Sequence, residues 1–312
     1  MGKTAFIFPG QGAQYSGMGK DFYETYDIAK KVYRTAEEAT GIDVAQLCFT
    51  ENDRLDVTEY TQIAMLATEV AILKVLEQKG IRADCTAGLS LGEYGARAAA
   101  GVMELPELFW LIRCRGIFMQ EAYPVGGAMS AVLGLDADTI RRICQETAGT
   151  VSIANDNCPG QIVITGEEQA VQAACGKLQE SGAKRCVPLK VSGPFHSALL
   201  AGAGEKLAAE LEKVSVKSPG IPYLCNVEAD YVEDSAAIKG LLARQVSSTV
   251  RWRETMERML AEGVDTFIEI GPGRTLAGFL KKMSREVTVL NVAKVEDVDA
   301  VTAFFAERES AS

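Results

Sequence analysis

The chain has 312 residues, of which 47% are hydrophobic and 24% charged, and its formal net charge is −10 at pH 7. This balance is typical of a globular protein with room for one large domain and an insertion, while the negative charge argues against nucleic acid as a partner. No apolar run reaches the length of a membrane span and the N-terminus lacks a signal-peptide pattern, so we expect a cytoplasmic protein without a membrane partner.

The chain has eight cysteines and a single histidine. The cysteines are spread through apolar segments without a CxxC pair, which is typical of reduced thiols in a cytoplasmic protein. A metal site would have to be built from carboxylates alone, and the sequence has no such cluster. We therefore expect no bound metal.

The first part of the chain alternates strand and helix patterns. An apolar run at 4–8 ends at a Pro-Gly pair and predicts a buried strand. Then come a helix at 58–79, a short strand at 84–88, an alanine-rich helix from Leu91 and a helix at 105–121. The alternation returns near the C-terminus and favours an α/β fold with a mostly parallel sheet.

The middle of the chain has a different order of elements. Strand patterns occur at 128–133, 151–154, 161–165 and 185–189, helices at 136–147 and about 167–180, and a turn-rich segment at 155–160. The order β-α-β-β-α-β is that of a ferredoxin-like unit. We therefore predict a small domain at 127–196 inserted into a large α/β domain formed by 1–126 and 197–312, with a cleft between the two.

A G-x-S-x-G motif, Gly88-Leu-Ser-Leu-Gly92, lies where a predicted strand meets a predicted helix. A sharp turn there exposes the Ser90 hydroxyl, and flanking glycines let the strand and helix approach closely. The helix N-terminus also favours an oxyanion nearby. Ser90 is therefore a candidate nucleophile, and the alternative is a tight turn that carries a surface serine.

A nucleophilic serine needs a base, and the one histidine of the chain is His196, at the end of the predicted insert. His196 is the candidate base, with an ordinary core or surface histidine as the alternative. Lipases and esterases have the order Ser, acid, His, with the histidine near the C-terminus. The position of His196 does not fit that layout.

Arg115 falls on the inward stripe of the helix at 105–121, seven residues after Leu108 and four after Leu111. A buried guanidinium is costly unless an anion meets it, and its planar fork suits a carboxylate. An internal salt bridge or a side chain that reaches back to solvent would also explain the pattern. The functional hypothesis is a pocket for a substrate carboxylate.

Two glycine-rich loops each follow a predicted strand. The loop at Phe8–Gln14 is not a dinucleotide-binding fingerprint, but it can turn backbone N–H groups toward an oxyanion. The loop at Glu269–Leu276 lacks the Lys-Ser/Thr ending of a P-loop. We interpret it as a structural turn.

Together these segments resemble the malonyl-CoA:acyl-carrier-protein transacylases of fatty-acid synthesis and the related acyltransferase domains of polyketide synthases. The matching stretches follow the family order along nearly the whole chain: Phe8-Pro-Gly-Gln-Gly-Ala-Gln14, Thr61-Gln62, Gly88-Leu-Ser-Leu-Gly-Glu-Tyr94, Arg115-Gly-Ile-Phe-Met-Gln120, Asn157-Cys-Pro-Gly-Gln161, Gly193-Pro-Phe-His-Ser197, Val250-Arg-Trp252 and Glu269-Ile-Gly-Pro-Gly273. The resemblance implies a hydrolase-like α/β domain with a ferredoxin-like insert.

The resemblance also implies roles for the three candidate residues. Ser90 would carry a malonyl ester, His196 would take the serine proton and later activate the carrier thiol, and Arg115 would bind the malonyl carboxylate. Around them, the backbone N–H groups of Gln11 and Leu91 would form the oxyanion hole. Two further side chains would line the pocket, namely Gln62 and Asn157.

Three other positions take their meaning from the same resemblance. The Val250–Trp252 segment would supply, at Val250 or Arg251, the backbone carbonyl that orients the histidine. Phe195 resembles the malonyl-selecting version of the family, because its bulk leaves little room for an α-methyl group. Position 89 is commonly histidine in the family and is Leu89 here, so we expect activity with an altered pocket polarity.

The predicted activity is malonyl transfer from malonyl-CoA to the phosphopantetheine thiol of an acyl carrier protein, by a monomer and without a cofactor. A free-standing acyltransferase that serves a polyketide synthase is the nearest alternative. An acyl hydrolase that releases free acid and a catalytically silent carrier-binding module are the others. An acidic carrier would meet a basic rim, for which the candidates are Lys184, Arg185, Lys190, Lys281, Lys282 and Arg285.

Overall fold

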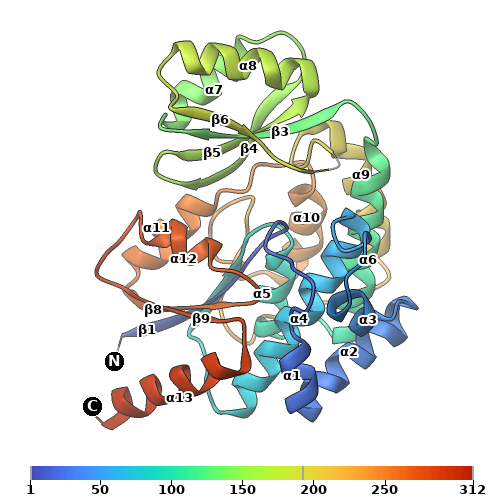
Figure 1. Ribbon diagram of the computed structural model, residues 1–312, viewed down its shortest axis with the longest axis vertical. Coiled ribbons are helices and arrows are strands. Elements are labelled where there is room, and N and C mark those ends of the chain that lie inside the picture. The colour runs from blue at the N-terminus through green and yellow to red at the C-terminus, as the bar shows by residue number, and fades with distance from the viewer. Residues whose placement is uncertain (1, 192, 311–312) are drawn as a thin grey trace.

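Five parallel strands form the central sheet of the computed structural model, which describes residues 2–191 and 193–310 (Figure 1). In spatial order they are β7 (Tyr223–Leu224), β2 (Cys85–Gly88), β1 (Lys3–Phe8), β8 (Val264–Ile270) and β9 (Thr288–Val292). Every neighbouring pair is parallel. Parallel sheets are covered on both faces, which explains the apolar runs in these strands. The predicted α/β class with a mostly parallel sheet is confirmed.

Alternate residues of β1 reach two separate apolar clusters, because successive side chains of a strand point to opposite faces. Phe6 and Phe8 belong to the larger cluster, and Ala5 and Ile7 to the second. Helices of the larger cluster include α2 (Asp27–Thr40), α4 (Thr58–Gln78), α6 (Leu105–Ala122), α9 (Ala201–Leu211) and α10 (Ser235–Gln245). The second cluster contains α11 (Trp252–Ala261) and α12 (Thr275–Leu280). Further helices are α1 (Lys20–Thr25), α3 (Val44–Phe49), α5 (Gly92–Ala100), the 3-10 turn η1 (Ala198–Leu200) and α13 (Val295–Ser310).

The helix α4 occupies the predicted position but is buried on nearly all sides rather than along one stripe. It packs against α2, α6 and α5, so even polar positions such as Thr68 are enclosed. Despite its length and apolar character, neither α4 nor any other helix within the described residues is suited to cross a membrane.

A second sheet, of four antiparallel strands, is formed by the middle of the chain and lies at one end of the molecule (Figure 1). Its spatial order is β4 (Val151–Cys158), β5 (Gln161–Glu167), β3 (Gly127–Leu133) and β6 (Arg185–Pro188). Two helices, α7 (Ala137–Gln145) and α8 (Glu168–Glu180), share an apolar cluster with this sheet. The elements follow the β-α-β-β-α-β order expected from the sequence. The division into domains at 126/127 and 196/197 stays a prediction.

The strand β4 is longer than the sequence suggests, because it continues through Asn155–Cys158, where we expected a turn. Only Pro159 and Gly160 form the turn to β5. Asn and Asp are unfavourable in strands, but tertiary contacts outweigh that preference here. Asn155 pairs with Val250, and the Asp156 backbone N–H donates to the Val250 carbonyl at 3.0 Å. This pairing joins the second sheet to the segment before α11.

Candidate active site

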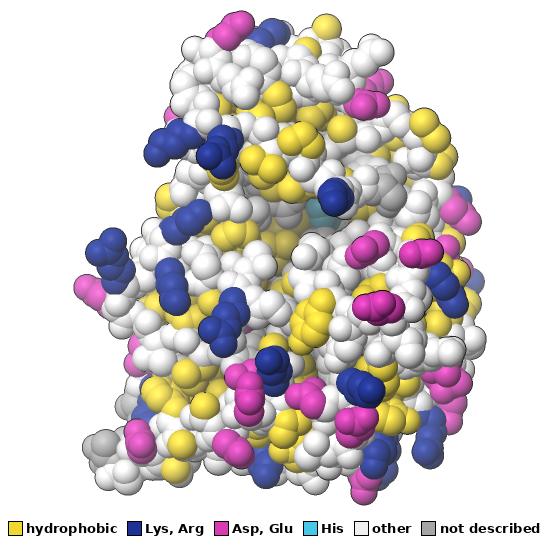
Figure 2. All heavy atoms as spheres, in the orientation of Figure 1, with side chains coloured by type: hydrophobic (Ala, Val, Ile, Leu, Met, Phe, Trp, Pro, Cys, Tyr) yellow, Lys and Arg dark blue, Asp and Glu magenta, His cyan; other side chains and the backbone are white. Residues whose placement is uncertain are grey.

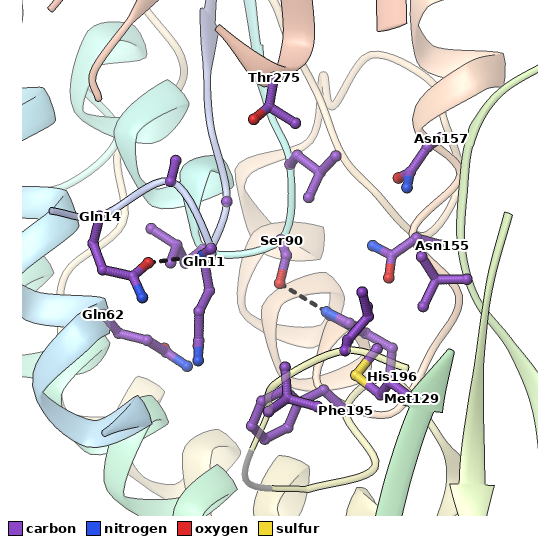
Figure 3. Close-up of a pocket in the computed structure, with 18 of the residues that line it drawn as sticks. Gln11, Gln14, Gln62, Ser90, Met129, Asn155, Asn157, Phe195, His196 and Thr275 are labelled. Carbon is purple, nitrogen blue, oxygen red and sulfur yellow. Dashed lines mark hydrogen bonds between the residues drawn. The ribbon is translucent and has the colours of Figure 1, made fainter. Parts of the chain in front are cut away.

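A pocket of about 870 Å³ lies between the two sheets, at the carboxyl ends of β1 and β2. This is the edge at which ligands bind in open parallel sheets. The β1 loop contributes Gln11 and the β2 loop contributes Ser90, while the second sheet contributes side chains from β3, β4 and β5. Figure 3 shows Ser90 and His196 pointing toward each other in the middle of this pocket.

Ser90 forms the turn between β2 and α5 with a φ of 55°, a left-handed conformation that non-glycine residues rarely adopt. The turn is tight: a Cβ atom on Gly88 would lie 1.9 Å from the carbonyl oxygen of Gly92. The buried Asn226 side chain holds it in place. Its Oδ1 accepts from the Ser90 backbone N–H at 2.7 Å, and its Nδ2 donates to the Gly88 carbonyl at 2.7 Å.

His196 is bonded at both ring nitrogens. Its Nε2 lies 2.7 Å from Ser90 Oγ, and its Nδ1 lies 2.9 Å from the backbone carbonyl oxygen of Gln245. A carbonyl only accepts, so Nδ1 carries the hydrogen and Nε2 is free to accept from the serine hydroxyl. Burial, and after it the positive charge of Arg115, lowers the pKa of His196 to about 4. The imidazole is therefore neutral at pH 7, as a general base must be.

The carbonyl that orients the histidine is not the one expected, and the prediction of Val250 or Arg251 is wrong. The Val250 carbonyl accepts from the Asp156 N–H, and the Arg251 carbonyl accepts from the Thr255 N–H inside α11. Gln245 is instead the last residue of α10. The last carbonyls of a helix have no partner within it, so one is available for the imidazole.

Arg115 is 1% exposed, and the bonds that its guanidinium makes go to neutral groups. Its Nη1 donates to Gln62 Oε1 at 2.6 Å, and its Nη2 donates to Gln245 Oε1 at 3.0 Å and to Ser90 Oγ at 3.1 Å. The Nε atom has no partner among the described residues. Burial lowers the pKa of Arg115, but a guanidinium stays charged in proteins.

Glu93, a carboxylate whose charge acts on Arg115, is already paired. It forms a fully buried salt bridge with Arg97 at 2.6 Å and accepts hydrogen bonds from the Asn226 backbone and the Gln245 side chain. Within the described residues, no salt bridge reaches Arg115. A buried cation without a bonded carboxylate, in contact with the nucleophile, is suited to bind an anionic substrate group.

The backbone N–H groups predicted to form the oxyanion hole belong to Gln11 and Leu91. Leu91 lies at the N-terminus of α5, and Gln11 lies in the loop after β1; both line the pocket. Neither N–H donates a hydrogen bond within the described residues. The Gln11 side chain donates to Thr58 Oγ1 at 3.1 Å. Such a pair of preorganised donors can stabilise a tetrahedral oxyanion.

The other predicted site residues also lie around this pocket, namely Gln62, Leu89, Asn157 and Phe195. Three further polar residues were not predicted: Gln245, Asn226 and Asn155. Asn155 lies in the segment that we interpreted from its sequence as a turn, so strand alternation could not point to it. Gln245 and Asn226 carry no local signal. Within residues 2–191 and 193–310, no group of three or more His, Cys, Asp or Glu side chains is placed to hold a metal.

Comparison with known proteins places this geometry in a family. Residues 5–303 match the family model of the acyl transferase domain. The malonyl CoA-acyl carrier protein transacylase of Bacillus subtilis is 43% identical over 304 residues, covering 96% of each chain. The crystal structure of the malonyl CoA-acyl carrier protein transacylase from Clostridium perfringens has a TM-score of 0.95 at 41% identity, covering 99% of this chain and 98% of that one.

A second solved structure contains a partner. It is a type II PKS acyl-carrier protein in complex with its malonyl-transacylase, with a TM-score of 0.94 at 38% identity, covering 97% of this chain and 99% of that one. The similarity to these proteins extends over nearly the full length of the chains. The chain therefore belongs to the acyl transferase family, among the malonyl CoA-acyl carrier protein transacylases.

Proposed function

We propose that this chain transfers a malonyl group from malonyl-CoA to the phosphopantetheine thiol of an acyl carrier protein, through an ester on Ser90. The observation that carries the proposal is the position of Arg115. Its guanidinium is buried, has no bonded carboxylate among the described residues, and donates to Ser90 Oγ at 3.1 Å. A malonyl carboxylate held there lies one short acyl chain away from the nucleophile.

In the first half-reaction, Ser90 Oγ attacks the thioester carbonyl while its proton passes to His196 Nε2. The oxyanion is directed to the N–H groups of Gln11 and Leu91. When the tetrahedral intermediate collapses, the C–S bond breaks and the CoA sulfur takes the proton from His196. The products are a malonyl ester on Ser90 and free CoA.

In the second half-reaction, the carrier thiol gives its proton to His196 and its sulfur attacks the ester carbonyl. The C–O bond then breaks and Ser90 Oγ takes the proton back, leaving malonyl thioester on the carrier. The Gln245 carbonyl holds the imidazole in the tautomer that both steps require. No redox step occurs, so the proposal includes no cofactor.

The pocket rim supports an acidic carrier as the partner. Figure 2 shows several Lys and Arg side chains beside the hollow between the two parts of the molecule, although the net charge is −10. Lys190 lines the pocket itself. Lys282 is exposed and donates to Gln161 Oε1 at 2.8 Å. Opposite charges steer a carrier to such a rim, and the effect weakens with salt.

The pathway that the carrier serves has two candidates. Fatty-acid synthesis fits the resemblance noted in the sequence. A polyketide pathway is favoured by the structural likeness to a malonyl-transacylase bound to a type II PKS acyl-carrier protein. Because the chemistry is the same, the two differ only in the carrier that is preferred. The transfer rate to carriers of both kinds distinguishes them.

The proposal places the enzyme in the cytoplasm as a monomer. All eight cysteines are unpaired, which fits a reducing compartment. Ser90, His196, Arg115 and Gln245 all come from one chain, so a single copy contains the whole constellation. Both statements stay predictions, and sedimentation velocity tests the second.

The direct test compares transfer with hydrolysis. The chain is mixed with malonyl-CoA and a phosphopantetheinylated carrier, and malonyl-carrier and free malonate are measured together at low and high salt. We expect malonyl-carrier to exceed malonate and its formation to slow as salt rises. Malonate as the main product in the presence of the carrier identifies an acyl hydrolase and overturns the proposal.

A further inference from the structure

The first turn of α5 carries a buried carboxylate, Glu93, that the proposed mechanism does not use. Glu93 lies three residues after Ser90, is 0% exposed and is not among the residues that line the pocket. Its Oε1 accepts from Arg97 Nη2 at 2.6 Å, one turn further along the helix. An ion pair with this spacing is common in helices, and it accounts for only one of the two carboxylate oxygens.

The other carboxylate oxygen bonds to the two residues that hold the catalytic groups. Glu93 Oε2 accepts from the Gln245 side chain through Nε2, and from the Asn226 backbone N–H at 3.3 Å. Gln245 in turn accepts from Arg115 Nη2 through Oε1, and from His196 Nδ1 through its backbone carbonyl. The carboxylate is therefore one residue away from both the guanidinium and the imidazole.

Three acceptors, of which Glu93 is the charged one, decide which end of the Gln245 carboxamide faces Arg115. A carboxylate only accepts hydrogen bonds, so it is met by the Nε2 end of the amide. Nε2 also donates to the Ser90 carbonyl at 3.0 Å and to Asn226 Oδ1 at 3.3 Å. The Oε1 end is thereby left to the guanidinium, which only donates. An amide turned the other way would set oxygen against oxygen on one side and N–H against N–H on the other.

We infer that Glu93 is a positioning residue: its Oε2 holds the Gln245 side chain, and through it the Arg115 guanidinium, where the malonyl carboxylate binds. The inference rests on the proposed function. The role belongs to the acceptor oxygen, since the ion pair with Arg97 is made through Oε1. Hydrogen bonds to a charged group are stronger than those between neutral groups, so the carboxylate is a firm anchor for this buried amide. The preference for malonyl over acetyl groups therefore depends on Glu93.

The test separates the acceptor oxygen from the ion pair, because removal of the carboxylate alone would leave Arg97 as an unpaired buried cation. Both test variants therefore carry Arg97→Met. One combines it with Glu93→Gln, which keeps an acceptor oxygen. The other combines it with Glu93→Met, which keeps the unbranched shape but has no oxygen. For each, kcat/KM for Ser90 acylation is measured with malonyl-CoA and with acetyl-CoA, and the free energy of unfolding is measured in urea.

We expect Glu93→Gln/Arg97→Met to keep the preference for malonyl-CoA over acetyl-CoA within about 2-fold of wild type, because its oxygen still accepts from the Gln245 amide. Glu93→Met/Arg97→Met should lose about 3- to 10-fold of that preference, the size of one net hydrogen bond. A general loss of stability lowers both rates and leaves their ratio unchanged. An equal preference in the two variants overturns the inference. If Glu93→Met/Arg97→Met does not fold, as judged by circular dichroism, Glu93→Leu/Arg97→Met replaces it with the same readout.

A further comparison tests the route through Gln245. When Gln245→Met is added to both test variants, their preferences should differ by less than about 2-fold, because a residue that acts through this side chain has no effect in its absence. A difference that persists shows that Glu93 does not act through Gln245, and contradicts the inference.

The matched control uses a second arginine–glutamate pair, Arg113 and Glu59, which are 2.8 Å apart and outside the pocket lining. Glu59→Gln and Glu59→Met, each combined with Arg113→Met, should keep the wild-type preference. If these two variants differ as much as the test variants do, the effect is not specific to Glu93 and the inference is wrong.

The wild-type chain is measured first, because its result separates the two claims. A wild type that forms no Ser90 ester with malonyl-CoA contradicts the proposed function itself. A wild type that forms the ester and prefers malonyl-CoA, together with test variants of equal preference, contradicts only the positioning role of Glu93.

Discussion

Gln245 Oε1 accepts a hydrogen bond from Arg115 Nη2 at 3.0 Å, while the backbone carbonyl of the same glutamine faces His196 Nδ1 at 2.9 Å. The Gln245 side chain also donates through Nε2 to the Ser90 carbonyl at 3.0 Å. One residue at the end of α10 thus contacts the proposed nucleophile, base and carboxylate-binding group. The position of the guanidinium relative to the imidazole therefore depends on where this helix ends.

This arrangement predicts that activity is lost on the acid side of the pH profile only at an unusually low pH. Only neutral His196 can accept the serine proton, and its pKa of about 4 keeps it neutral well into the acid range. We expect kcat/KM, which reports on the free enzyme, to be flat above about pH 5 and to fall below it. If the acid limb of the wild type lies near the ordinary histidine pKa, the low pKa assigned to His196 is contradicted.

The charge of Arg115 is the second cause of that low pKa. Arg115→Met removes the charge, so the acid limb measured with acetyl-CoA is expected to move upward toward the ordinary value. The same variant should lose about 10- to 100-fold of the preference for malonyl-CoA over acetyl-CoA, the size of a charged hydrogen-bond contribution. The control is Arg113→Met, because Arg113 lies on the same helix but is paired with Glu59. This variant should change neither the acid limb nor the preference for malonyl-CoA. Unchanged selectivity in Arg115→Met removes the arginine from its proposed role.

Asn226→Ala is expected to weaken both the fold and the acylation step. It leaves the Ser90 N–H and the Gly88 carbonyl without their partner, at a cost of about 1–3 kcal/mol in the free energy of unfolding. The φ of 55° at Ser90 is then less firmly held, so the Ser90 acylation rate should fall as well. Urea unfolding and rapid-quench kinetics measure the two effects.

Asn52→Ala is the matched control for that experiment. Asn52 also caps backbone groups through several hydrogen bonds, but it lies in the segment between α3 and α4. The Asn52→Ala variant should have a lower free energy of unfolding without any change in the Ser90 acylation rate. An Asn226→Ala variant that behaves in the same way would show that the asparagine has no part in placing the nucleophile.

Phe195→Ala is expected to admit a branched acyl group. Phe195 is 5% exposed and lines the pocket next to His196. Removing the ring should raise kcat/KM for methylmalonyl-CoA relative to malonyl-CoA by about 10-fold. This is within the range of discrimination that an enzyme achieves on the basis of one methyl group. The measurement is a competition between the two thioesters. An unchanged ratio places the steric limit at another side chain.

The sequence predicts those parts of the site that have local signals. Ser90 stands at a recognisable strand-to-helix turn, Arg115 interrupts an apolar helical stripe, and His196 is the single imidazole of the chain. The sheet follows in the same way from short apolar runs alternating with helices. Each of these inferences needs only neighbouring residues and their spacing.

The parts that were missed depend on contacts between distant segments. Gln245 acts on His196 through its backbone, 49 residues away, and a carbonyl leaves no mark in the side-chain pattern. Asn226 reaches Ser90 across 136 residues. The strand at Asn155–Cys158 was expected to be a turn from its composition, and its pairing with Val250 outweighs that local preference.

The central claim, an acyl-enzyme on Ser90, is tested most directly by mass spectrometry of the intact chain after mixing with malonyl-CoA alone. The wild type should gain the mass of one malonyl group, peptide mapping should place it on Ser90, and Ser90→Ala should gain none. Adding the carrier should remove the group and return the chain to its original mass. A wild type that gains no mass, or a Ser90→Ala variant that still transfers malonyl to the carrier, would contradict the account.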